Sequence, residues 1–112
     1  MKIDTRAQGI ELSASLHEHI ERCLDFRLHW ARHEVSRIVI SLSDINGPRG
    51  GNDKCCQVRI PLSHMRDVLI DEVADDLRVA IARAIDRAAR SLERRLSRQR
   101  EFGPTPLLVT EE

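Results

Sequence analysis

The sequence predicts an α+β domain. We expect a two-layer sandwich in the chain order β-α-β-β-β-α, with a four-stranded sheet and both helices on one face of it. Four segments have the alternating or β-branched apolar residues of strands, and hydrophobic residues recur every three to four residues in two others, as in helices. Each helix has an apolar stripe to hide, so both must cover the same face of the sheet. A chain of 112 residues is long enough for one domain with its own core.

The first strand and helix are predicted from the opening third of the chain. Residues 2–7 alternate in character, which predicts a strand with one solvated face. Two caps are possible for the helix that follows: Ser13 as the N-cap, or a capping box formed by Ser15 and Glu18. We expect that helix to end within residues 29–33. Its apolar side comprises Leu16, Ile20, Cys23, Leu24, Phe26, Leu28 and Trp30. We therefore expect Phe26 and Trp30 to belong to the core rather than to a platform for stacked bases.

A hairpin and a further strand are predicted from the middle of the chain. Residues 35–45 are rich in β-branched side chains, and residues 54–62 alternate, so the two segments read as antiparallel partners. Between them, residues 46–53 read Asn-Gly-Pro-Arg-Gly-Gly-Asn-Asp, which is turn chemistry throughout. Residues 67–71 form a short fourth strand.

The last helix is predicted over Val73–Arg100, a stretch without glycine or proline, with Asp71 or Asp75 as its cap. Its apolar positions are Leu77, Ile81, Ala84, Ile85, Ala88, Leu92 and Leu96. With ~100° of rotation per residue, a second set of residues falls in a stripe roughly 80° wide around the helix axis, well apart from the apolar positions. The second stripe comprises Arg83, Arg87, Arg90, Arg94 and Arg98. Asp86 and Glu93 lie off it by the same geometry and are expected to neutralise it poorly.

The charge of the chain is unevenly distributed. The formal net charge is zero. Residues 74–100 nevertheless contain eight arginines and four acidic residues, a net charge of +4, so the remainder carries −4. The arginine stripe thus has two interpretations: a surface for a polyanion, or a solvated face with ion pairs along the helix.

Other sequence signals argue against a catalytic or metal-binding protein. No apolar run could span a membrane, and the N-terminus lacks signal-peptide character. Three cysteines, two of them adjacent, do not suggest a disulfide framework, so a cytoplasmic location is expected; Cys56 should be in the core and Cys55 partly exposed. No ligand spacing completes a zinc site and no catalytic signature is present, so we expect no metal, no cofactor and no enzymatic activity.

Three stretches resemble one known family. They are Ile3–Leu12, Leu42–Cys56 with its Asn-Gly-Pro-Arg-Gly-Gly loop, and Ala80–Ala88. Over roughly Met1–Arg100 the chain resembles the ribosome hibernation-promoting factor family, also called the ribosome-associated inhibitor or sigma-54 modulation protein family. The resemblance implies a fold like that of a double-stranded-RNA-binding domain. It also implies the short form of the family, with a ribosome-binding domain at 1–101 and a flexible tail at 102–112.

The resemblance implies a function as well. Family members bind the small ribosomal subunit in the channel for messenger and transfer RNA, where basic residues face ribosomal RNA and keep idle ribosomes inactive. Carried over to this chain, the RNA-binding residues are Arg83, Arg87, Arg90, Arg94, Arg98, Arg22, Arg49 and Lys54. The alternative, which the neutral total charge favours, is a small regulatory module that binds an acidic protein partner without RNA. No membrane and no small-molecule substrate are expected as partners.

Overall fold

The computed structural model describes residues 1–45 and 54–102, and the side chains of this part as far as residue 98. The predicted turn at 46–53 and residues 103–112 of the predicted tail lie outside this description. In chain order the elements are β1 (Lys2–Gln8), α1 (Ala14–Leu28), the short 3-10 helix η1 (His29–Ala31), β2 (Arg37–Asp44), β3 (Lys54–Ile60), β4 (Val68–Ala74) and α2 (Leu77–Phe102). The predicted order β-α-β-β-β-α is confirmed.

The four strands form one mixed sheet in the order β1-β2-β3-β4. β1 and β2 pair in parallel, while β2–β3 and β3–β4 pair antiparallel. A parallel pair needs a crossover connection, and α1 provides it. One row of facing residues crosses the whole sheet, consisting of Arg6, Ser41, Gln57 and Asp71. We call the side of the sheet that carries this row the open sheet face.

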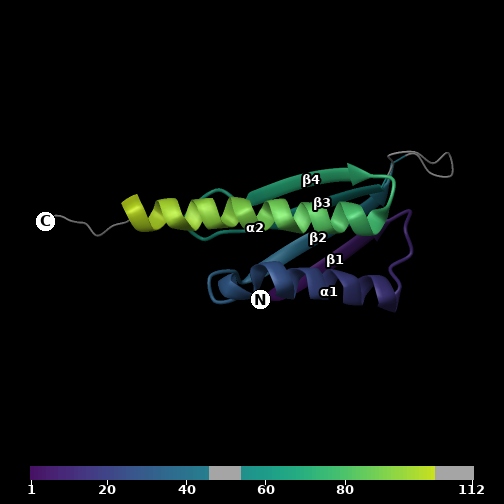
Figure 1. Ribbon diagram of the computed structural model, residues 1–112, viewed down its shortest axis with the longest axis horizontal. Helices are drawn as coiled ribbons and strands as arrows, with labels where there is room; N and C mark the ends of the chain where they lie inside the picture. Colours follow the sequence, from purple (N-terminus) through teal and green to yellow (C-terminus); the bar gives the residue numbers. More distant parts are fainter. Residues whose placement is uncertain (46–53, 103–112) are drawn as a thin grey trace, which may run out of the picture.

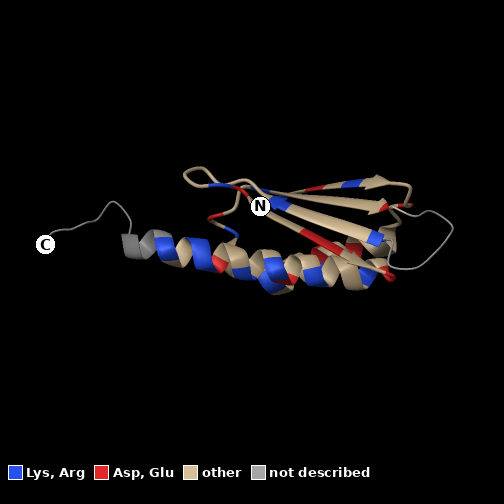
Figure 2. Ribbon diagram, turned by 90° about the horizontal axis from the view of Figure 1, so that it is seen from above, with Lys and Arg blue, Asp and Glu red and all other residues tan. Residues whose placement is uncertain are grey.

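Both helices cover the opposite side of the sheet, so the molecule has the two predicted layers (Figure 2). α2 packs on β3 and β4, and α1 lies beside it toward β1 (Figure 1). The helices run in the same direction, because Ser15 near the start of α1 hydrogen-bonds Arg78 near the start of α2. Further along, Arg27 of α1 pairs with Asp86 of α2.

The core lies between the layers and is aliphatic. The fully buried side chains of largest volume are Ile20, Leu24, Leu28, Ile38, Ile40, Leu42, Ile60, Ile81, Ile85, Leu92, Val35 and Val58. α2 adds small residues, since Ala80, Ala84 and Ala88 are also fully buried and allow the helix to approach the sheet. A 26-residue helix is about 39 Å long and a seven-residue strand about 23 Å, so α2 extends beyond the sheet at its C-terminal end (Figure 1).

The start of the last helix differs from the prediction. Val73 and Ala74 were expected in the helix, but they complete β4, where they pair with Cys55 and Lys54. Ladder hydrogen bonds with β3 satisfy this backbone, and that pairing is not visible in the local helical pattern. The cap is neither Asp71 nor Asp75: Asp76 Oδ1 accepts a hydrogen bond of 2.9 Å from the backbone N–H of Arg78.

The first helix follows the prediction at its start but not on its apolar side. Ser13 Oγ accepts a 3.1 Å hydrogen bond from the backbone N–H of Leu16, as expected for the N-cap. Phe26 and Trp30, however, are not core residues, because they are 82% and 44% exposed. The core contacts of α1 come from a strict four-residue repeat beginning at Leu16, and Phe26 lies about 200° around the helix from Leu24, which belongs to that repeat.

The adjacent cysteines divide between the two faces of the sheet as predicted. Cys56 is buried among the core residues, and burial raises the pKa of its thiol to about 12. Cys55 is half-buried and lines the open sheet face beside Ser43 and Gln57. The alternation of a strand places neighbouring side chains on opposite sides.

The core predicts the effect of truncating Ile81, which is fully buried in α2. Replacing it with alanine leaves a cavity, so Ile81→Ala should lower the free energy of unfolding by about 2–5 kcal/mol in chemical denaturation. Val79→Ala, on the same helix at a position that is 37% exposed, should change it by less than about 0.5 kcal/mol. A loss below about 1 kcal/mol for Ile81→Ala would show that this face of α2 is not the packed one.

Candidate nucleic-acid interface

The rotation of α2 about its axis decides where its arginines point. The helix presents the side of Ile81, Ala84 and Ala88 to the sheet, and the core holds it there. Side chains on the other side must therefore face solvent. Arginine positions follow one another along α2, with few acidic positions between them (Figure 2). The five arginines of the predicted second stripe are all exposed in the structure.

Four of the predicted RNA-binding arginines make no hydrogen bond or ion pair within the described part of the chain. They are Arg22, Arg83, Arg94 and Arg98, and we call them the free arginines. All four are exposed. Arg22 belongs to α1 and the other three to α2, so both helices contribute to one surface. Guanidinium groups without an internal partner are available to carboxylates or phosphates from outside.

Arg87 is different, because it is bound to the sheet. Its Nη1 donates a 3.0 Å hydrogen bond to the backbone oxygen of Asp71 and also contacts the carboxylate of Glu72. The Glu72 side chain is only 17% exposed, so the pair sits at the seam between α2 and β4. Arg87 thus has a structural contact that the arginine stripe in the sequence did not indicate.

Arg90 is also paired, which corrects an expectation. Asp86 was expected to neutralise the stripe poorly, yet its carboxylate accepts a 2.5 Å hydrogen bond from Arg90 Nη2 and pairs with Arg27 of α1. Asp86 and Arg90 are four residues apart, a spacing at which long side chains meet on a helix. The angular position of a residue around the helix axis gives the direction in which its side chain leaves the backbone. It does not show whether two side chains, such as those of Asp86 and Arg90, can still reach each other.

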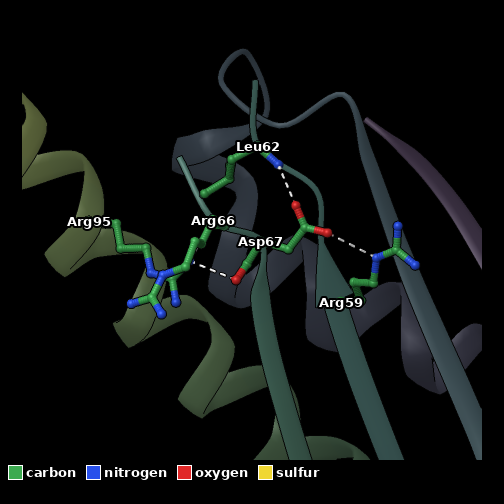
Figure 3. A network of polar contacts seen from close by, with 5 residues as sticks. All are labelled: Arg59, Leu62, Arg66, Asp67 and Arg95. Carbon is green, nitrogen blue, oxygen red and sulfur yellow. Dashed lines mark hydrogen bonds and ion pairs between the residues drawn. The ribbon is translucent and has the colours of Figure 1, made fainter. Parts of the chain in front are cut away.

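Arg95 lies outside the stripe and holds a loop. Its guanidinium donates to the backbone oxygen of Asp67 at 2.7 Å and to that of Arg66 (Figure 3). The Asp67 carboxylate in turn accepts hydrogen bonds from Arg59 at 3.1 Å and from the backbone N–H of Leu62 at 3.4 Å. The network ties the connection between β3 and β4 to α2, so this arginine contributes to the fold.

The remaining predicted basic residues belong to the β2–β3 hairpin. Lys54 Nζ lies 3.1 Å from the Asp44 carboxylate, and both side chains are more than two-thirds buried. Arg49 lies outside the described residues, and the side chain of Arg100 in α2 is not described either. The structure therefore places Arg22, Arg83, Arg94 and Arg98 at exposed positions of the two helices, and Lys54 at the start of β3 in the sheet.

A metal site would need several ligand side chains close together. Residues 1–45 and 54–98 contain no cluster of three or more potential metal ligands. His19 Nε2 and Cys23 Sγ of α1 lie 3.7 Å apart, but they form a pair and not a cluster of three. No helix in the described part of the chain combines the length and hydrophobicity that crossing a membrane requires.

Comparison with known proteins identifies the family. The family model described as sigma 54 modulation protein / S30EA ribosomal protein matches residues 3–100. The chain belongs to this family. No match was found among curated protein sequences.

Solved structures similar to the chain show the same fold. The N-terminal domain of Protein Y from Thermus thermophilus has a TM-score of 0.68 at 22% identity, over 84% of this chain and 98% of that one. A ribosomal subunit interface protein from Coxiella burnetii has a TM-score of 0.62 at 24% identity, over 90% of this chain and 99% of that one. The β-α-β-β-β-α architecture of the family is thus present in this chain.

A pocket between the two helices was not predicted from the sequence. This pocket of about 280 Å³ is lined by Phe26 and Arg27 of α1, Trp30 of η1, and Ala89, Arg90 and Glu93 of α2. A signal was present in the sequence, because Phe26 is out of phase with the four-residue repeat of Leu16, Ile20 and Leu24. An aromatic residue off the core repeat of an amphipathic helix is expected to point away from the core.

The contacts of Arg87 predict a difference between two arginines of one helix. Arg87→Ala removes two hydrogen bonds to β4, so it should lower the free energy of unfolding by about 0.5–1.5 kcal/mol in chemical denaturation. Arg83→Ala is the matched control, with no partner among the described residues, and should stay within about 0.5 kcal/mol of the parent. Equal effects of the two changes would contradict this division.

Proposed function

We propose that the chain is a ribosome-associated translational inhibitor. Its helix layer binds ribosomal RNA of the small subunit in the decoding channel, and the bound domain keeps an idle ribosome inactive. Family membership supports association with the ribosome. The observation that carries the RNA contact is the set of free arginines, which are exposed on the two helices and have no acidic partner in the described chain.

The free arginines suit a phosphate backbone. Arg83 and Arg98 are fifteen residues apart on α2, about 22 Å along the helix axis, and Arg94 lies between them. A guanidinium group can make two parallel hydrogen bonds to one phosphate and remains charged at every relevant pH. Phosphate contacts fix position and orientation but do not read sequence. The proposed mechanism is therefore occlusion by a rigid domain that fills space needed by messenger and transfer RNA.

The two arginines with carboxylate partners, Arg87 and Arg90, are expected to contribute less to RNA binding. Arg87 and Arg90 would have to exchange or share carboxylate partners to bind phosphate, so each should add less than a free arginine. Arg49 and Lys54 remain proposed contacts of the hairpin tip, on the basis of the family loop. The chemistry is that of binding, and the proposal includes no catalytic step.

The dependence of binding on salt tests this proposal. Each phosphate contact releases counterions, so four contacts should give a slope of log affinity against log salt of roughly −3 to −4, at ~0.7–0.9 per contact. Arg94→Ala should weaken binding to purified small subunits and reduce the slope by about one contact's worth. Affinity would be measured at several salt concentrations by sedimentation.

The control is an arginine on the other side of the molecule. Arg6 lies on the open sheet face with its side chain 63% exposed, and its partner Asp4 keeps a second hydrogen bond of 2.7 Å from Arg37. Arg6→Ala should therefore leave both affinity and slope unchanged. Equal losses for Arg6→Ala and Arg94→Ala, or no loss for either, would refute the proposed interface and favour a protein partner that needs no RNA.

A further inference from the structure

The pocket between the two helices combines exposed aromatic rings with a polar rim. Phe26, near the end of α1, and Trp30, in η1, line the pocket on the side opposite Ala89 of α2. Phe26 is 82% exposed and Trp30 is 44% exposed. Large apolar side chains that the fold leaves uncovered side by side mark an interaction site more often than a single exposed one does.

The indole ring is held in place. Trp30 Nε1 donates a 2.8 Å hydrogen bond to the backbone oxygen of Arg27, in the last turn of α1. This bond satisfies the only polar atom of the side chain and leaves the ring faces for apolar contact. A fixed ring binds a flat partner with less loss of side-chain freedom than a mobile one.

The charges around the pocket are arranged in two zones. Inside it, Arg27 and Arg90 are balanced by Asp86, which pairs with both, and by Glu93, so the pocket interior is close to neutral. Outside it, Arg22 is one turn before Phe26 and Arg94 one turn after Arg90, and both are free arginines. A flat uncharged group attached to a phosphate backbone matches this arrangement.

We propose that the Phe26–Trp30 pocket takes one unpaired nucleobase of the bound ribosomal RNA. The base stacks on the aromatic rings while its flanking phosphates bind Arg22 and Arg94. This inference rests on the proposed function, to which it adds a contact with a base where the arginines contact only the backbone. Every nucleobase has a π-face, so stacking here selects for an unpaired nucleotide rather than for a particular sequence.

The first test measures affinity for purified small subunits. Trp30→Ala should weaken binding about 5- to 150-fold, the effect of losing one stacked base, without changing the salt slope. Trp30→Phe should restore most of the affinity. Phe26→Leu, which keeps an apolar side chain but loses the ring, should weaken binding in the same way. Since both positions are exposed, circular dichroism should show unchanged folding.

The second test uses Trp30 itself, because it is the only tryptophan of the chain. An adenine oligoribonucleotide of ten residues should quench its fluorescence on binding. An abasic oligomer of the same length offers the same phosphates without bases, and it should bind without quenching. Equal quenching by both oligomers, or none by either at saturation, would overturn the proposal.

The two tests together separate the proposal from its alternatives. If the aromatic variants lose affinity for intact subunits but bind the oligoribonucleotide like the parent, the pocket meets a ribosomal protein and the nucleobase assignment is wrong. If the parent shows base-dependent quenching but does not bind small subunits, the base pocket stands and the proposed function fails. Unchanged subunit affinity in all three variants would refute the role of the pocket on the ribosome.

Discussion

The packing of α2 against the sheet is the constraint on which the rest of the structure depends. Ile81, Ile85 and Leu92 are fully buried, and a helix held at these positions has no freedom to rotate about its axis. That rotation alone decides which arginines reach solvent. The same packing aligns α2 beside α1, so that Arg22 joins the arginines of the second helix. The candidate interface is thus a consequence of the core.

Internal ion pairs then divide the arginines into two groups. Arg87 and Arg95 hold α2 to β4 and to the β3–β4 connection, and Arg90 shares Asp86 with Arg27 of α1. Surface pairs of this kind contribute modestly to stability, yet they compete directly with any phosphate for the same guanidinium group. A chain with zero net charge can in this way present a basic face, because its acidic residues neutralise selected arginines and not others.

Much of the fold could be predicted from the sequence, and less of the site. Periodicity identified all six major elements, the Ser13 cap and the division of Cys55 from Cys56, since these depend on neighbouring residues. The join between β4 and α2 was placed too early because strand pairing with β3 is a long-range interaction. The pairing of Asp86 with Arg27 depends on where α1 lies relative to α2, which local patterns do not contain. The pairing of Asp86 with Arg90 and the exposure of Phe26 are local, and both could have been predicted from residue spacing along each helix.

The most direct test of the central claim asks which side of the molecule touches ribosomal RNA. A photoreactive amino acid would replace either Val79, one turn before Arg83 on α2, or Leu69 on the open sheet face. Both positions are exposed, at 37% and 56%, and neither carries charge. On small subunits, the probe at position 79 should cross-link to ribosomal RNA and the probe at position 69 should not. Cross-links to RNA from position 69, or only to protein from position 79, would contradict the account.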